Sequence, residues 1–474
     1  MISTKKFIIL SLLNLLLFSQ IAGAQDVNKL SIEQTKWLSK AIRHEKNGWI
    51  YLHIEGKPAE RGFQHGYLMA KEIAEGISSL KAKWDHNTAM DWSFYIQKAK
   101  EILTPKVDSE NLTEMEGIVQ GMKSAGIETT IDEIVAINAY VELMNYWWPT
   151  VKDSVHSFSP LRPKESCSSF IATGSMTADG NIVLAHNTMD GYQNPECNVI
   201  IDIVPEQGHR ILMQTISGMI HSETDFFITD AGLVGSETTI GAFTHFDPKG
   251  DPEFSRMRHA TQYASTIDEW CEIMKKNNNG GYANAWLLGD INTNEIARLE
   301  LGLKYVGFEK KKDGYFIGSN VAEDHKILRL ETTRDETDIR LSSIARRVRW
   351  KQLMKENTGK INVKLAKEFE ADHYDSYLKK IRPGSRSLCG HWEIDPQFIG
   401  NDLPYSPEGT VDVKVVDANM AKQMSFTARW GAACGMPFDA KKFLDEHPQF
   451  EWMNGFLKDR PTQPWTVFKA GETK

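Results

Sequence analysis

The sequence predicts an α+β fold in which β-sheets are covered by helices. Two observations lead to this prediction. Residues 25–150 have mainly helical spacing of their apolar positions, and the character changes to short β-type runs at Cys167. Beyond that point strands, helices and further strands follow one another in blocks. Such blocks favour sheets with helices packed on them over an alternating fold with one parallel sheet.

The first residues, 1–24, have the pattern of a secretory signal peptide. Two lysines precede an apolar run over 7–18, and a small-residue cleavage site ends at Ala24, directly before Gln25. The alternative, a membrane anchor, is weaker because the run is shorter than the ~20 residues that span a bilayer. We therefore expect a secreted or periplasmic protein with no stable membrane span.

The segment that follows is expected to be mainly helical, with one short strand. The predicted helices cover 31–42, 62–80 and 111–125, and the strand covers 48–55. A polar, proline-containing stretch over 150–166 then has the composition of a loop, and it ends at Cys167.

Short β-type runs begin after Cys167. The first two cover 168–173 and 181–186 and flank a loop that ends in Asp179-Gly180, which is a hairpin signal. Further strands are expected at 199–204, 211–220, 226–229, 237–243, 286–288, 297–301, 315–317 and 410–416, with helices at 254–276 and 340–355.

Length and composition limit the class of protein. With 474 residues, the chain can form one large core or two fused units. Its hydrophobic content of 41% is sufficient for a buried core. A net charge of −8 argues against nucleic acid as the main partner and leaves small neutral or lipid substrates open.

Cys167 is the candidate nucleophile. A buried cysteine at the start of a strand is usually a small hydrophobic residue, but the loop before it favours chain cleavage between Ser166 and Cys167. The thiol would attack the preceding carbonyl, and water would hydrolyse the thioester. Cleavage would leave Cys167 with an α-amino group of pKa about 7.7–8.0, which suits a general base for its own thiol.

The predicted hairpin supplies neighbours for this thiol. A loop over 173–180 would pair Cys167 with His186. The side chains of His186, Asn187 and Asp190 would then lie where an acyl intermediate forms. The alternatives are a histidine whose hydrogen bonds are satisfied at a strand end and an aspartate that only forms a turn.

Isolated polar residues near later strand ends complete the candidate site. Thr238 is a candidate substrate-binding residue, and Asn284 and Asn320 flank apolar runs. An asparagine amide that stabilises an oxyanion is worth about 3–4 kcal/mol to the transition state. Strand-end asparagines also form turns, which is the alternative for both.

The cysteines give a further expectation. Five cysteines, an odd number, leave at least one thiol unpaired in a compartment that permits disulfides. Cys389 and Cys434 each precede a glycine in turn-like segments, so we expect these two to pair first. We see no CxxC or clustered Cys/His spacing and expect no structural zinc or other metal site. No cofactor is expected, since the chemistry needs only a thiol, an amine and oxyanion donors.

Several segments resemble the phospholipase B-like family of N-terminal-nucleophile (Ntn) hydrolases. The resemblance rests on 166–169 and 186–188, with further motifs at 236–240, 282–286 and 409–414. Upstream, 55–66 is similar to the amino-terminal motif of the related C45 acyl-CoA:6-aminopenicillanate acyltransferase/peptidase group. The family usually has Trp where this chain has Met189, which leaves lipid ester and N-acyl amide substrates both open.

The resemblance implies a four-layer αββα sandwich, the Ntn-hydrolase fold, with a mainly helical N-terminal segment. Self-cleavage would leave 25–166 released or retained as a separate chain and 167–474 as the catalytic core. It also implies roles: Cys167 as nucleophile and base, and the candidate polar residues as pocket or oxyanion groups, namely His186, Asn187, Asp190, Asn284 and Asn320. The expected reaction is deacylation of lipids; an acyltransferase, an N-acyl amidase or peptidase, and a non-catalytic lipid- or glycan-binding protein are the alternatives.

One further catalytic residue follows from the resemblance. In related amidases a strand-end asparagine is followed by an arginine on a helix, and Asn320 and Arg346 match that order. The alternative for Arg346 is a solvated basic helix face within 345–349.

Overall fold

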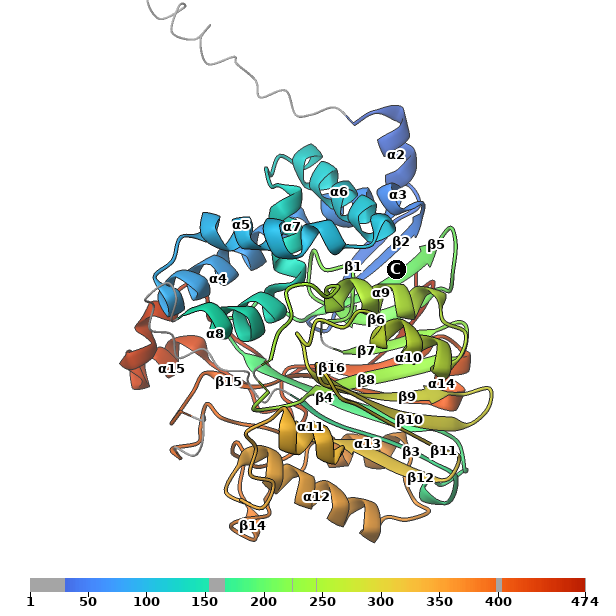
Figure 1. The fold of residues 1–474 in the computed structure, drawn as a ribbon, viewed down its shortest axis with the longest axis vertical. Helices are drawn as coiled ribbons and strands as arrows, with labels where there is room; N and C mark the ends of the chain where they lie inside the picture. Colours follow the sequence, from blue (N-terminus) through green and yellow to red (C-terminus); the bar gives the residue numbers. More distant parts are fainter. Residues whose placement is uncertain (1–29, 153–166, 224, 244, 398–402, 474) are drawn as a thin grey trace, which may run out of the picture.

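The computed structural model describes residues 30–152, 167–223, 225–243, 245–397 and 403–473 (Figure 1). They form two large β-sheets. The nine-stranded sheet contains, in spatial order, β1 (Ile42–Lys46), β2 (Trp49–Gly56), β5 (Val199–Pro205), β6 (Ile211–Thr215), β7 (Phe226–Thr229), β8 (Leu233–Thr239), β9 (Asn284–Asp290), β10 (Glu295–Leu301) and β11 (Val306–Lys311). The six-stranded sheet contains β12 (Gly314–Gly318), β3 (Cys167–Thr173), β4 (Val183–Gly191), β15 (Glu408–Asp417), β16 (Ser425–Trp430) and β17 (Thr466–Lys469).

Helices cover both outer faces of this pair of sheets. Those before Cys167 are α2 (Ile32–Leu38), α3 (Pro58–Leu68), α4 (Ala70–Thr88), α5 (Trp92–Ile102), α6 (Ser109–Ser124), α7 (Ile131–Asn138) and α8 (Trp148–Val151), with the π-helix η2 (Glu142–Trp147) and the 3-10 turn η1 (Thr104–Lys106). Those after it are α9 (Glu253–Tyr263), α10 (Ile267–Lys275), α11 (His325–Leu330), α12 (Ser342–Glu356), α13 (Val363–Glu370), α14 (Ala418–Lys422) and α15 (Ala440–Glu446), with the 3-10 turn η5 (Pro448–Met453).

The hydrophobic clusters show that the layers are helix, sheet, sheet, helix. Ile171 and Leu184 of the six-stranded sheet pack against Ile200 and Leu212 of the nine-stranded sheet in a central core. The opposite face of the nine-stranded sheet packs against α4, α6, α7, α9 and α10. The opposite face of the six-stranded sheet packs against α12 and α13, which lie at the far side of the sheets from α4 to α7 in Figure 1. The predicted αββα sandwich is confirmed.

The N-terminal segment is built into this sandwich. It is mainly helical, as predicted, but its strands β1 and β2 form one edge of the nine-stranded sheet, and β2 pairs with β5 in parallel. The two parts of the chain on either side of Cys167 therefore share one sheet and one core.

The motif at 55–66 brings two helices into close contact. Gly62 and Gly66 on α3 face Gly117 and Gly121 on α6. A Cβ atom added at Gly62 would lie 1.8 Å from the carbonyl oxygen of Glu114, so no larger residue fits there. Glycine is required because the two helix backbones touch.

Several predicted boundaries are wrong. The helix expected over 254–276 is two helices, because Thr266 caps a new one by accepting a hydrogen bond from the backbone N–H of Glu269. The strand expected over 211–220 ends at Thr215, where turns follow. Among the described residues no helix is long and apolar enough to cross a membrane. The predicted signal peptide, its cleavage site at Ala24 and Gln25, and Ser166 lie outside the described residues.

Candidate active site

Cys167 is the first residue of β3 and is buried, with 2% of its surface exposed. In the antiparallel register of β3 and β4 it lies opposite Thr188, and Ser169 lies opposite His186. The predicted pairing of Cys167 with His186 is therefore wrong by two residues. Cys167 therefore lies two residues nearer to the Gly191 end of β4 than predicted.

The length of the hairpin loop explains this error. The predicted loop covered 173–180, but the 3-10 turn η4 (Gly174–Met176) follows β3, and β4 begins only at Val183. Side chains alternate between the faces of a sheet with a period of two residues. A shift of two therefore leaves His186 on the same face as Cys167, which is the face toward the second sheet.

Two side chains hold the main chain of Cys167. Its backbone N–H donates to Asn320 Oδ1 at 3.4 Å, and its carbonyl oxygen accepts from Arg346 Nη1 at 2.5 Å. Arg346 Nη2 also donates to Asn320 Oδ1 at 2.8 Å. The three residues therefore form a closed ring of hydrogen bonds around the nitrogen that would become the α-amine.

Asn320 is held in an unusual backbone conformation. It follows β12 with φ of 65°, in the left-handed region that asparagine tolerates better than most residues. Its Nδ2 donates to the carbonyl oxygen of Thr239 at 2.9 Å, and this bond fixes which end of the amide faces Cys167. Asn320 is predicted to donate to the oxyanion, but its amide nitrogen already donates to Thr239.

Arg346 is fully buried on α12, so the solvated basic face is wrong for this residue. One turn further along α12, Trp350 Nε1 donates to Ser168 Oγ at 2.8 Å, next to Cys167. Residues four apart lie on the same face of a helix. This face of α12 therefore anchors the start of β3 at two points.

Two buried carboxyl groups lie next to the thiol. Ligand atoms of Cys167, Asp225 and Glu237 all lie within 4.8 Å of one another. Tyr282 Oη lies 2.8 Å from a carboxyl oxygen of each acid. Because a tyrosine hydroxyl has one hydrogen to donate, one of the two acids must carry a proton and donate to it.

The environment keeps these carboxyl groups neutral. Burial raises the pKa of Asp225 to about 8. Burial and the neighbouring Asp225 raise the pKa of Glu237 well above its ordinary value. Burial also raises the pKa of the Cys167 thiol, and the two acids add to this effect. The thiol therefore needs a nearby base and a nearby positive charge to ionise.

Lys414 on β15 supplies a positive charge near the thiol. Its ammonium lowers the pKa of Cys167, against the dominant effect of burial. Lys414 Nζ donates to Thr188 Oγ1 and to Asp412, and Thr188 Oγ1 donates to the same carboxylate at 3.0 Å. The lysine and the aspartate are both fully buried, so their opposite charges stabilise each other inside the sandwich.

His186 lies on the same face but bonds elsewhere. Its Nε2 donates to the carbonyl oxygen of Glu237 at 2.8 Å. Burial, with a contribution from Lys414, lowers the pKa of His186 well below its ordinary value, so the ring is neutral. The histidine therefore positions β8 against β4 and carries no charge to the thiol.

Asn187 and Asp190 lie apart from this cluster. Asn187 points to the opposite face of β4, where its Nδ2 donates to the carbonyl oxygens of Glu370 and Leu388 at 2.9 and 3.0 Å. Its predicted place in the pocket is wrong because adjacent residues of a strand face opposite sides. Asp190 accepts hydrogen bonds from the backbone of Gly191 and the amide of Asn194.

Asn284 and Thr238 lie on opposite faces of the nine-stranded sheet. Asn284 begins β9 and faces α9, where burial raises the pKa of Glu253 to about 7 and the Asn284 amide partly opposes that shift. Thr238 instead lies against Gly318 of β12, two residues before Asn320. Asn284 lies opposite Thr239 in the ladder of β8 and β9, so it shares its face of the sheet with Glu237.

Sequence reasoning missed three groups beside the thiol: Asp225, Tyr282 and Lys414. Asp225 and Tyr282 lie far apart in the chain and in segments where polar residues are common. Lys414 had a signal, because Asp412 and Lys414 occupy alternate positions of an otherwise apolar strand. Opposite charges two residues apart on a buried face indicate an internal ion pair.

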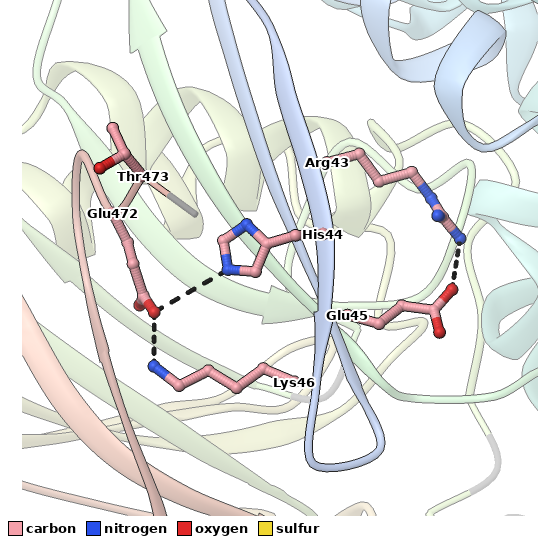
Figure 2. Close-up of a pocket in the computed structure, with 6 residues that line it drawn as sticks. All are labelled: Arg43, His44, Glu45, Lys46, Glu472 and Thr473. Carbon is pink, nitrogen blue, oxygen red and sulfur yellow. Dashed lines mark hydrogen bonds and ion pairs between the residues drawn. The ribbon is translucent and has the colours of Figure 1, made fainter.

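A depression on the surface lies elsewhere. It has a volume of about 580 Å³ and is lined by Arg43, His44, Glu45, Lys46, Glu472 and Thr473. Figure 2 shows His44 and Lys46 reaching toward Glu472 on one side and Arg43 paired with Glu45 on the other. These charges satisfy one another, and none of the candidate site residues lines the depression.

The predicted disulfide between Cys389 and Cys434 is absent. Both residues are free thiols, and their sulfurs lie with the rings of His373 and His391 in one group of four. The imidazole of His391 faces both sulfurs, with its Nε2 at 3.3 and 3.5 Å from them. This group and the group of Cys167, Asp225 and Glu237 are the sets in the described ranges that could hold a metal ion.

The family model described as phospholipase B matches residues 41–306, more than half of the chain. A putative phospholipase B-like 2 of Homo sapiens is 31% identical over 145 residues, which cover 26% of this chain and 24% of the human protein. Phospholipase B-like protein C of Dictyostelium discoideum is 21% identical over 519 residues, covering 93% of this chain and 88% of that protein. The chain spans less than half the length of the first curated relatives that it matches.

Among solved structures, a conjugated bile acid hydrolase from Clostridium perfringens is 11% identical. The match covers 64% of this chain and 96% of that chain, with a TM-score of 0.33.

Proposed function

Because this chain belongs to the phospholipase B family, we propose that it is an exported, self-processing cysteine acyl hydrolase that deacylates lipids. One observation carries the proposal. The nitrogen of Cys167 donates to Asn320 Oδ1, and Arg346 fixes that oxygen from its other side. An acceptor held at this position is what a free α-amine at Cys167 would require to be oriented toward its own thiol.

Maturation would begin with the thiol of Cys167. Its sulfur attacks the carbonyl carbon of Ser166, and the peptide bond between the two residues breaks. The nitrogen of Cys167 takes the proton and becomes an amine, while the acyl group stays on sulfur as a thioester. Water then hydrolyses the thioester and restores the thiol, so the step needs no other reactant.

Catalysis would repeat this chemistry on a substrate. The α-amine accepts the thiol proton, and the thiolate attacks the acyl carbonyl. The ammonium then protonates the leaving group, and water, deprotonated by the amine, hydrolyses the thioester. Asn320 Oδ1 accepts one hydrogen of the amine and so orients its lone pair toward the sulfur.

Neutral donors beside the sulfur would stabilise the oxyanion. Tyr282 and the protonated acids Asp225 and Glu237 form a buried donor network next to Cys167. A carboxyl group kept neutral by burial can donate a hydrogen bond to developing negative charge. Asn284 lies opposite Thr239 in the ladder of β8 and β9, so it shares its face of the sheet with Glu237 and belongs to the same group of candidate donors.

Intact-mass analysis tests the proposal. The wild-type chain is expected as two fragments that meet between Ser166 and Cys167, and Cys167→Ala as one uncut chain. Cys271→Ala is the matched control, because Cys271 is a buried cysteine on α10 on the outer side of the other sheet. An uncut wild-type chain would contradict the proposal.

The substrate class requires a second assay. The purified, cut protein would be tested with phospholipid esters and with N-acyl amides of matched chain length, with and without added amine acceptors. Ester hydrolysis supports the proposal, and preferred amide hydrolysis or acyl transfer to the amine supports the amidase or transferase alternative. A cut protein that turns over none of these substrates, and whose behaviour thiol-blocking reagents leave unchanged, would indicate a binding protein.

A further inference from the structure

A second group of reactive side chains lies away from Cys167, on the outer side of the six-stranded sheet. It consists of His373, Cys389, His391 and Cys434, and each offers a ligand atom within 4.8 Å of the others. His373 follows α13, Cys389 and His391 lie on one loop, and Cys434 follows β16. Cys389 and His391 are buried and the other two half-buried.

Three distances between these atoms are close to the edges of a tetrahedron around a zinc ion. With bonds of about 2.0–2.1 Å to nitrogen and about 2.3 Å to sulfur, the edges are about 3.3 Å between two nitrogens and about 3.6 Å between nitrogen and sulfur. Nε2 of His373 and Nε2 of His391 lie 3.3 Å apart. His391 Nε2 lies 3.3 Å from the sulfur of Cys389 and 3.5 Å from that of Cys434.

The environment of His391 also suits a metal ligand. Its Nδ1 donates to Glu393 Oε1 at 2.8 Å, so the lone pair is on Nε2, which faces the other three ligand atoms. A carboxylate behind a histidine that orients it in this way is a recurrent feature of metal sites.

We propose that His373, Cys389, His391 and Cys434 bind one structural zinc ion. Two thiolates and two imidazoles form a neutral complex with Zn²⁺, and the two thiols release their protons on binding. All four positions are taken by protein atoms, which leaves none for a substrate or water and distinguishes a structural site from a catalytic one.

The ion would fasten three separate segments to the sheet that carries Cys167. The backbone N–H of Cys389 donates to the carbonyl oxygen of Asp372, and Thr410 on β15 donates its N–H to Gly390. The buried Asn187 on β4 holds the carbonyl oxygen of Leu388, directly before the first cysteine ligand. This gives Asn187 a structural role, since it ties the proposed zinc loop to the strand opposite the nucleophile.

A disulfide between Cys389 and Cys434 is the competing state. It would consume both thiolates and leave the two imidazoles without a common partner. The two states differ in mass and in metal content, so one preparation distinguishes them. The proposal does not depend on the proposed hydrolase activity, because it concerns a different face of the sheet.

The test is metal analysis of the full-length protein after incubation with Zn²⁺ alone and removal of the excess. We expect about one zinc per chain, and no mass decrease of ~2 Da for a disulfide on denatured, unreduced protein. A Co²⁺-substituted sample should absorb in the visible region and show a thiolate charge-transfer band. Added Zn²⁺ should displace the cobalt and abolish both the visible absorption and the charge-transfer band.

Variants assign the ligands. Cys434→Ser and His373→Ala, at the half-buried positions, should each lose zinc and the cobalt signal and should melt at a lower temperature than wild type. Cys271→Ser, outside the group, should keep about one zinc. Wild-type protein without bound zinc, a disulfide in its mass, or a ligand variant that retains full zinc content would each overturn the proposal. The cobalt spectrum of wild-type protein decides the question if a variant fails to fold.

Discussion

Asn320 Oδ1 accepts hydrogen bonds from both the backbone nitrogen of Cys167 and the guanidinium of Arg346. One amide oxygen thus joins Cys167 to a buried positive charge. The oxygen cannot turn away, because the other end of the amide is bonded to Thr239. The position of the Cys167 backbone is therefore fixed in the uncut chain.

Replacing Asn320 should impair both maturation and turnover. We expect Asn320→Gly, which keeps the positive φ but removes the amide, to lower kcat by about 10²-fold, in the range of lost acid–base positioning. Asn320→Asp keeps an oxygen for the amine and for Arg346 and should retain most activity. For both variants, mass spectrometry would follow the rate of chain cleavage, and an activity assay would give the rate of ester hydrolysis. Equal losses in the two variants would contradict the assigned role of the oxygen.

The buried acids should limit activity at alkaline pH. The rate should rise as the α-amine loses its proton near pH 7.7–8.0 and fall as Asp225, with a pKa of about 8, ionises next to the thiol. The two ionisations together should give a narrow bell-shaped dependence of the rate on pH. In Asp225→Asn, which tolerates the φ of 56° at this position, the alkaline limb should disappear. A profile unchanged by this substitution would count against the neutral-acid donor.

The same carboxyl group makes a prediction about stability. Its pKa in the folded protein is higher than the value of about 3.9 in an unfolded chain. Its contribution to the free energy of unfolding is thus complete below that value and is lost as the pH rises through about 8. Between pH 4 and 9, the free energy of unfolding measured with denaturant should fall less steeply with pH for Asp225→Asn than for wild type. An identical decline in both proteins would rule out this source of pH dependence.

The buried ion pair of Lys414 and Asp412 should contribute to the stability of the folded protein. Lys414→Met leaves Asp412 as a buried, uncompensated carboxylate, and we expect a loss of about 3–5 kcal/mol in the free energy of unfolding. The double variant Asp412→Leu with Lys414→Met should recover most of this loss. Chemical denaturation of both variants measures the difference. A double variant that is as unstable as the single one would indicate that the lysine acts through other contacts.

The N-terminal fragment should remain bound after cleavage. It supplies β1 and β2 to the nine-stranded sheet, and β2 forms a complete parallel ladder with β5. Losing it would expose the edge of β5 and the helix-covered core. We expect native mass spectrometry to give the sum of both fragments and denaturing analysis to give each separately. A catalytic fragment that is folded and active alone would contradict this expectation.

The sequence by itself determined the order of most elements and singled out Cys167 as the candidate nucleophile. The change from helical to strand-like spacing at Cys167 is a local pattern that correctly predicted sheets covered by helices. The motifs around it are also local, and the family resemblance that rests on them implied the sandwich. Hydrophobic periodicity is a property of neighbouring residues, so it can be read without knowing what packs against them.

Only the tertiary structure decided which side chains meet. A loop two residues longer than expected moved Thr188 opposite Cys167, and strand alternation took Asn187 to the far face, away from the thiol. Asp225, Tyr282 and Lys414 come from three distant strands or loops, and His373 reaches Cys434 across 61 residues of chain. These contacts depend on strand register, on the face of the sheet that a side chain occupies and on long-range packing. Each of these depends on how distant segments fit together, and the local pattern of one segment does not contain that information.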